Sequence, residues 1–287
     1  MRLIAHRSFM LSMIYSAILC IFACFSPAQK RIDTDVASVV LQVEKNIAAL
    51  RAKLPDFVCK EQIDMQEVAD GKVVKVGRHV STLVAVRRRK GDSDSGFAES
   101  REDISATENG KKVKAAGYVP PFGVRGGFAE DLFQSFDEST GKCYDFKFAG
   151  REEVRGHTAL VVDIQAKADD QQFGSQCAHL VARSTAKVWI DAESLQVVRL
   201  QKPTVKSLWF QGPFAKTNGE YLGTSIIEYA PVIINDVKYW LPAEKKVEFV
   251  RTKGQRSFAY QIEYSDFHKF DTSIKILEST IAVQNKR

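Results

Sequence analysis

The stretch ARSTAKVWIDAESLQVVRLQ, residues 182–201, decides the class of fold. Two β-prone runs, Ala182–Ile190 and Leu195–Gln201, flank a polar turn at Asp191–Ser194, and this arrangement is typical of a β-hairpin. Two sets of side chains alternate along the first run: Ala186, Val188 and Ile190 against Lys187 and Trp189. Because successive residues of a strand point to opposite sides, the alternation predicts a sheet with two distinct faces.

The same pattern of β-prone runs between turn residues extends over most of the chain. Turn signals occur at Asp70-Gly71, Arg155-Gly156-His157, Asn235-Asp236 and Lys253-Gly254. The strands expected around them are Val58–Met65, Val73–Arg89, Cys143–Val154, Thr158–Lys167, Tyr221–Ile234, Val237–Arg251 and Phe258–Phe270. Lys90–Gly96 is expected to be a loop, and the pattern indicates a mainly β chain.

Two segments have a helical period instead. Asp33–Leu54 repeats its valines and other apolar residues every three or four positions, and Pro55 ends the run. Phe128–Phe136 repeats large apolar residues at the same spacing, which predicts a short amphipathic helix after the Gly/Pro-rich Gly117–Gly127. The expected fold class is therefore α+β, mainly β: one curved antiparallel sheet with two helices.

The first 28 residues have the features of a secretory signal peptide. Arg2 and Arg7 form a positive start, Phe9–Phe25 is apolar, and Ser26-Pro27-Ala28 ends in small residues. We predict cleavage between Ala28 and Gln29, one domain over 29–271 and a C-terminal tail over 272–287. Export to the periplasm or the medium follows from this prediction. The alternatives are a retained membrane anchor, or a lipoprotein in which Cys24 is acylated.

The charge balance argues against nucleic acid as a partner. Without Arg2 and Arg7, the mature chain has 39 Lys+Arg (41 minus 2) against 35 Asp+Glu, which is only mildly basic. The dense patch Arg87–Lys90 is interpreted as a solvated strand end, with contact to anionic headgroups as the alternative.

Three cysteines follow the predicted cleavage site. Cys143 opens a strand, and Cys177 follows the far end of that strand's partner, so antiparallel pairing predicts a Cys143–Cys177 disulfide. Cys59 would then be the spare thiol. Cys177-Ala178-His179 offers too few ligands for a metal, and no metal or cofactor is expected. His157 and His268 are expected to be surface residues, and no hydrolase, P-loop or dinucleotide motif supports an enzyme.

Several short motifs spread over the chain resemble known exported proteins. Leu54–Lys60, Gly123–Phe133, Val188–Asp191 and Tyr239–Pro242 are similar to segments of a group of secreted, uncharacterised acidobacterial proteins. The later segments also resemble periplasmic lipoprotein carriers of the LolA/LolB fold. That resemblance implies an incomplete, strongly curved antiparallel β-barrel, with helices over its open side and an apolar cavity between. Residues 57–127 match no carrier motif. None of the carriers' gating positions can be matched in this sequence, so no functional residue is transferred.

The aromatic residues are the remaining functional signal. They are interpreted either as ordinary core or as the lining of an apolar pocket beneath a lid helix. The ligand-lining candidates are Phe122, Phe128, Leu132, Phe133, Phe136, Trp189, Trp209 and Trp240. Three hypotheses follow: a non-catalytic envelope protein that binds a lipid or lipidated partner, a structural or partner-binding envelope module, and, more distantly, an unrecognised hydrolase. A monomer with peripheral membrane contact is compatible with the first.

Overall fold

A computed structural model describes residues 35–87, 97–116, 127–128, 130–136, 141–167, 185–208, 219–251 and 255–270. The chain divides into two compact units, Met1–Asp35 and Val36–Arg287, and every described helix and strand belongs to the second. No helix within these ranges is long and apolar enough to cross a membrane.

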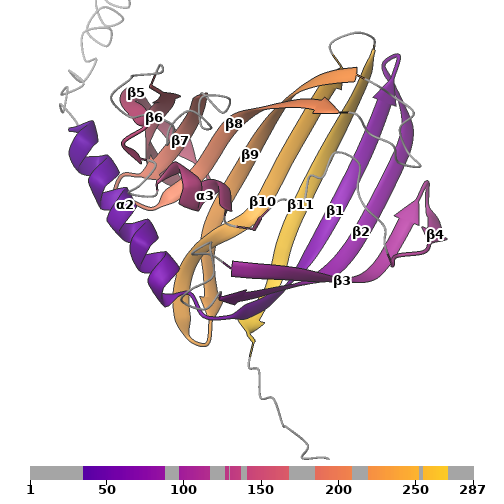
Figure 1. The fold of residues 1–287 in the computed structure, drawn as a ribbon, viewed down its shortest axis with the longest axis horizontal. Helices are drawn as coiled ribbons and strands as arrows, with labels where there is room; N and C mark the ends of the chain where they lie inside the picture. The colour runs from indigo at the N-terminus through magenta and orange to yellow at the C-terminus, as the bar shows by residue number, and fades with distance from the viewer. Residues whose placement is uncertain are drawn as a thin grey trace, which may run out of the picture. The chain divides into compact units, whose positions relative to one another are not determined.

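The second unit is built on one antiparallel sheet, in the order β4-β3-β2-β1-β11-β10-β9-β8-β7-β6-β5. Its strands are β1 (Phe57–Ala69), β2 (Lys72–Arg87), β3 (Phe97–Glu108), β4 (Lys111–Val113), β5 (Tyr144–Val154), β6 (His157–Ala166), β7 (Thr185–Asp191), β8 (Val197–Leu208), β9 (Gly219–Ile234), β10 (Val237–Arg251) and β11 (Arg256–Lys269). The sheet is open, with β4 and β5 as its edges, and it curves (Figure 1). The expectation of a mainly β chain on an unclosed antiparallel sheet is confirmed.

The tight hairpins form where the sequence supplies residues that tolerate a left-handed backbone. Both central residues have positive φ at Asp70-Gly71, Asn109-Gly110, Arg155-Gly156 and Asn235-Asp236. Two such residues make a turn whose twist matches that of the flanking strands. Gly71, Gly110 and Gly156 adopt this geometry without a side-chain clash, whereas Asp236, with φ of 63°, lacks that freedom.

The helix α2 (Val36–Lys53) packs its apolar stripe on the sheet and ends just before Pro55, as predicted. Val40, Val43 and Ile47 are its buried residues. Arg87, at the end of β2, caps the helix: its guanidinium donates to the carbonyl oxygens of Ala52, at 3.1 Å, and Leu54. Arg87 is therefore engaged by α2 and is not merely a solvated strand end, while Arg88–Lys90 lie outside the described residues.

The helix α3 (Glu130–Ser135) is shorter than the predicted Phe128–Phe136. Phe128 lies in a turn before the helix and Phe136 in a bend after it, so both ends of the predicted range are flanking residues.

Strands β3 and β4 are absent from the sequence prediction, which assigns no element to residues 97–116. The reason is composition. The half-buried positions of β3 include Glu99, Arg101 and Asp103, so charged side chains occupy the positions where an apolar alternation would mark a strand.

The sheet buries side chains on both faces in its β5–β8 half. Val188 and Ile190 belong to the main core, together with residues of α2, α3, β1 and β11. Trp189 belongs to a second cluster with Val161 and Val198. The predicted alternation along residues 186–190 is thus confirmed.

Candidate functional site

The segment Phe128–Phe136 covers part of the main core through aromatic contacts; we call it the cover. The ring of Phe128 makes an edge contact with Tyr264 of β11, with centroids 4.8 Å apart. It also lies 5.3 Å from the ring of Phe57 and 5.9 Å from that of Phe267. Phe128 therefore rests on the ends of β1 and β11, which are neighbours in the sheet.

The rest of the cover reaches α2 and β5. Leu132, Phe133 and Phe136 are all buried in the main core. The guanidinium of Arg51, in the last turn of α2, lies 4.9 Å from the centre of the Phe133 ring. The Phe136 ring stacks on Phe146 of β5 at 6.1 Å. Four of the predicted ligand-lining residues are thus brought together in one short segment.

Beside Phe128, the same face of the sheet carries a buried polar cluster. Glu61 of β1 is fully buried, with 0% of its side chain exposed. The guanidinium of Arg101 binds both carboxylate oxygens, at 2.8 and 3.1 Å, and Ser81 Oγ donates to Oε2 at 3.2 Å. A bidentate Arg–carboxylate pair is among the stronger polar contacts in proteins, and this one is shielded from water.

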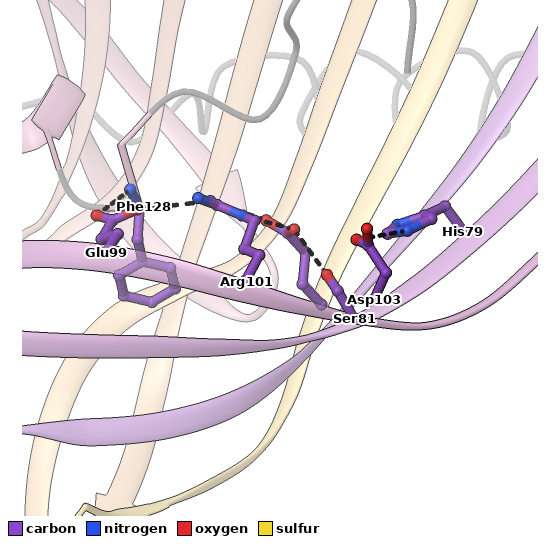
Figure 2. Close-up of polar contacts among 7 residues, drawn as sticks. His79, Ser81, Glu99, Arg101, Asp103 and Phe128 are labelled. Carbon is purple, nitrogen blue, oxygen red and sulfur yellow. Dashed lines mark hydrogen bonds and ion pairs between the residues drawn. The ribbon is translucent and has the colours of Figure 1, made fainter. Parts of the chain in front are cut away.

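Strand register explains why these residues meet. Glu61 pairs with Ser81 across β1 and β2, and Ser81 pairs with Asp103 across β2 and β3. Directly opposed residues of antiparallel strands project to the same face. The polar side chains of β2 and β3 on this face therefore lie in one row (Figure 2). In this row His79, which is 1% exposed, contacts Asp103 at 3.0 Å.

Glu99 connects the polar cluster to the cover. One of its carboxylate oxygens accepts a hydrogen bond from the backbone N–H of Phe128 at 2.7 Å. The other lies 3.5 Å from Nη2 of Arg101 (Figure 2). A charged acceptor thus holds the first residue of the cover, and Arg101 positions that acceptor.

Beside the cluster, burial keeps the Cys59 thiol and the Tyr264 phenol protonated. Burial, followed by the negative charge of Glu61, raises the pKa of Cys59 to about 12 and the pKa of Tyr264 well above its usual range. Burial alone would lower the pKa of Arg101. The hydrogen bond to Glu61 and the negative charge of Glu61 outweigh burial, so the pKa of Arg101 is raised. Cys59 is a free, buried thiol, and in its protonated form it is a poor nucleophile.

Of the tryptophan candidates, Trp189 lies apart from the cover. Trp189 belongs to the second cluster, where its indole N–H donates to Glu152 at 2.7 Å and Arg199 lies 5.3 Å from its ring centre. The half-buried Trp240 packs against both clusters. The structure therefore separates Trp189 from the other predicted lining residues.

Other predicted site residues fall outside the described ranges. These are Phe122, Trp209, Cys177, Cys24, Ala28 and Gln29. Cys143 is buried just before β5. Because Cys177 lies outside the described residues, the Cys143–Cys177 disulfide stays a prediction.

A second polar group, on β6 and the β7–β8 turn, superficially resembles hydrolytic machinery. His157 Nδ1 contacts Asp191 at 3.0 Å, and the Ser194 hydroxyl donates to the same carboxylate at 2.7 Å. Burial would raise the pKa of Asp191, but these contacts and the backbone N–H of Ser194 lower it. The serine is bonded to the aspartate rather than to the imidazole, so no base activates it. The group stabilises a turn.

Sequence reasoning missed Glu61, Glu99 and Arg101. One signal was present. Glu61 lies two residues from both Cys59 and Ile63, so in a strand this acid projects to the same side as two apolar side chains. Nothing in the sequence pointed to its partner, because β3 itself was not predicted.

Comparisons with known proteins agree with the fold class and go no further. No protein-family model matches the chain, and no curated protein sequence matches it. A solved putative outer membrane lipoprotein-sorting protein domain from Vibrio parahaemolyticus is 11% identical over 83% of this chain and 95% of its own, with a TM-score of 0.37.

Two further solved structures give similar values. A DUF1329 family protein from Desulfovibrio piger is 13% identical over 83% of this chain and 94% of its own, at a TM-score of 0.36. A LolA superfamily protein from Nitrosomonas europaea is 11% identical over 82% and 94%, at 0.32. Of the three, the Nitrosomonas europaea protein carries the name of the LolA class that the sequence resembles. Because these TM-scores are low, the description of the fold rests on the strand order and register of this chain's own sheet.

Proposed function

We propose that this protein is an exported, monomeric cell-envelope protein. In this proposal it binds an apolar ligand, a lipid or the lipid chain of a lipidated partner, between the sheet and the cover, without catalysis. The observation that carries the proposal is the cover itself: a short segment lies on an apolar sheet face through aromatic side chains, and a charged cluster holds its first residue.

The cover is suited to opening because its own structure is marginal. A helix of six residues, as α3 is, is not stable in isolation and depends on its packing. The buried side chains described in the cover are phenylalanine and leucine, so another apolar group could replace them on the sheet without leaving a side-chain hydrogen-bonding group unsatisfied.

The hydrogen bond from the backbone N–H of Phe128 to Glu99 would hold the cover closed. Opening the cover breaks the hydrogen bond between Phe128 N–H and Glu99, while Arg101 and Glu61 stay paired on the sheet. One charge-assisted hydrogen bond contributes about 1.5–3 kcal/mol, which a bound alkyl chain can offset through a few buried methylene groups.

A non-catalytic role is supported by the chemistry of the described groups. The Cys59 thiol is protonated at neutral pH, and the Ser194 hydroxyl donates to Asp191. Each would need a different arrangement to act as a nucleophile.

The alternative is a structural or partner-binding module with no small ligand. Its supporting observation is the burial of Phe133 and Phe136, at 6% and 2% exposure, because the same burial is expected when side chains fill the space completely.

Binding of a fluorescent fatty acid, measured together with the urea midpoint, separates these functions. In the ligand-binding case, Phe133→Ala weakens probe binding at least ten-fold and costs less than about 2 kcal/mol of stability, because the cover is removable. Phe57→Ala, in the sheet beneath, costs about 3–5 kcal/mol. Trp189→Phe, in the second cluster, is the matched control and leaves probe affinity unchanged.

The opposite result is equally clear. If the wild type binds no probe and Phe133→Ala and Phe136→Ala each cost about 3–5 kcal/mol, the cover is ordinary core and the module alternative stands. Export is checked separately by N-terminal analysis of the periplasmic protein, which should begin at Gln29. An acylated Cys24 would replace the soluble form with an anchored one.

A further inference from the structure

A lysine interrupts an apolar row on the face of the sheet that carries the main core; we call this the inner face. Strand register joins the row: Leu200 of β8 pairs with Ile227, Ile227 with Lys245, Lys245 with Ile262, and Ile262 with Ile63. Directly opposed residues share a face, so these side chains follow one another across β8, β9, β10, β11 and β1 (Figure 1). The four aliphatic residues are at most 2% exposed, whereas Lys245 is half-buried.

A buried serine lies in the next row of the inner face. Ser225 comes two residues before Ile227 on β9 and therefore projects to the same side. It is 2% exposed, and its Oγ has no hydrogen-bond partner among the described residues. A buried hydroxyl without a partner costs stability, so a bound group that completes its hydrogen bonding would be favoured there.

A second lysine lies beside the serine. Lys202 of β8 pairs with Ser225 of β9, and it is half-buried like Lys245. Lys245 is a diagonal neighbour of Ser225, because it opposes Ile227, two positions further along β9. Diagonal neighbours on adjacent strands lie about 7–8 Å apart, within reach of long side chains. We call Lys202, Ser225 and Lys245 the basic triad.

The surroundings of the triad in these two rows are apolar. Val247 and Tyr260 continue the row of Ser225 across β10 and β11, and both are buried. The carboxylate that these rows contain within the described ranges is that of Glu108, three strands beyond Tyr260, where Lys75 binds it at 2.6 Å. The triad therefore places positive charge and a hydroxyl within an apolar surface.

The triad lies on the same face as the cover and near it. Tyr264, whose ring contacts that of Phe128, lies two residues from Ile262 on β11. Ile262 opposes Lys245 on the neighbouring strand. An apolar chain held between the sheet and the cover would therefore bring its head group to the triad.

We propose that the ligand is an amphiphile with an anionic oxygen head group, a carboxylate or a phosphate, and that the basic triad binds this head group. This inference rests on the proposed ligand binding and names the chemical class of the ligand. Lys202 and Lys245 supply the positive charge, and Ser225 Oγ donates a hydrogen bond to the same oxyanion. The apolar chain packs on Ile227 and Ile262.

The test compares lauric acid with dodecanol, which share a chain length and differ in the head group. Each displaces Nile red, a neutral apolar dye, from the full chain at neutral pH, where the acid is ionised. The wild type is expected to bind the acid at least about ten-fold more tightly than the alcohol. Lys245→Met should abolish most of this preference, and Ser225→Ala should weaken acid binding about ten-fold, while both leave dodecanol affinity unchanged.

A phosphate amphiphile and inorganic phosphate identify the oxyanion. Tighter binding of lauroyl lysophosphatidic acid than of lauric acid would assign a phosphate head group, and the reverse order a carboxylate; both results support the triad. Inorganic phosphate has no chain and should not displace the dye. Displacement by inorganic phosphate as strong as that by either amphiphile would overturn the proposal, because the site would then bind an anion without a lipid chain.

The matched control is Lys246→Met. Lys246 is the next residue of β10, so it projects to the other face, where it is 53% exposed and pairs with Glu244 at 3.0 Å. The control removes the same charge from the same strand and should keep the preference for the acid. Lys245→Arg retains the cation and should keep it as well. Urea unfolding verifies that each variant is folded.

Two results would overturn the triad and leave apolar ligand binding in place: equal affinity of the wild type for lauric acid and dodecanol, or the same loss of acid binding in Lys245→Met and Lys246→Met. In both cases the dye and the alcohol still bind. If neither the dye nor any amphiphile binds the wild type, the proposed ligand binding fails and the triad proposal with it, so the two failures are distinguishable.

Discussion

Replacing Arg101 by methionine tests whether the buried cluster is a fully compensated ion pair. The change removes two hydrogen bonds to Glu61, of 2.8 and 3.1 Å, and leaves a carboxylate with no exposed surface to lose its cation. Breaking a buried pair from one side costs about 3–5 kcal/mol, because the remaining carboxylate is buried and has lost its bidentate cation. For a chain of this size, that lowers the melting temperature by about 6–20 °C.

The double variant Glu61→Gln/Arg101→Met gives the decisive comparison. It removes the buried charge together with its partner, so stability should return to within about 1–2 kcal/mol of the wild type. Urea unfolding followed by far-UV circular dichroism measures all three proteins. A single variant that loses less than about 1 kcal/mol, or a double variant no better than the single, would refute the reasoning.

The chain supplies a control with the same geometry and the opposite burial. Arg78 binds both carboxylate oxygens of Asp64 at 2.6 and 3.1 Å, but its side chain is 57% exposed. Arg78→Met should therefore cost less than about 1 kcal/mol, because water replaces the lost contact. Because the two ion pairs have similar geometry, the difference between the stability losses of Arg101→Met and Arg78→Met reports the effect of burial.

Four further predictions concern three single residues and one disulfide. Arg87→Ala should lower the free energy of unfolding by about 1–2 kcal/mol, since the last carbonyls of α2 lose their cap; an unchanged urea midpoint would mean that water caps them equally well. Cys59 should resist thiol reagents at pH 8 until the protein is unfolded. Its pKa is about 12 in the fold against 9.0 ordinarily, so its contribution to stability is complete below pH 9 and is lost as the pH rises toward 12; a Cys59→Ala variant that loses stability just as steeply in alkali would contradict this. Asp236→Gly should raise stability by about 0.5–1 kcal/mol by relieving a positive φ, and a lower melting temperature would count against that account. Peptide mapping without reduction should link Cys143 to Cys177, whereas a link from Cys59 to either would reject the pairing.

Much of the sheet could be predicted because its signals are local. A turn such as Asn235-Asp236 needs only residues that accept positive φ, and the strands beside it need only alternation or β-branched residues. The α2 helix was equally accessible, since its stripe of valines and the following Pro55 act within a few residues of each other.

The buried cluster was not accessible in this way. Glu61 and Arg101 are forty positions apart, and each alone is an ordinary surface residue type. Their pairing requires β3 to lie against β2, and β3 carries no apolar alternation because its inward positions are charged. Prediction of strands from hydrophobic alternation therefore fails at β3, where charged side chains project to the buried face of the sheet.

The position of Trp189 shows the same division. Alternation determined that it faces away from Val188 and Ile190, but not which face lies under the cover. By itself, the sequence determined the class of elements, the turns at Asp70-Gly71, Arg155-Gly156 and Asn235-Asp236, and the resemblance to an open, curved sheet, because these depend on neighbours along the chain. Only the tertiary structure decided that Glu61 is paired, that Glu99 holds Phe128 and that Lys202, Ser225 and Lys245 lie together on the inner face, because strand order and register bring together residues that no local signal connects.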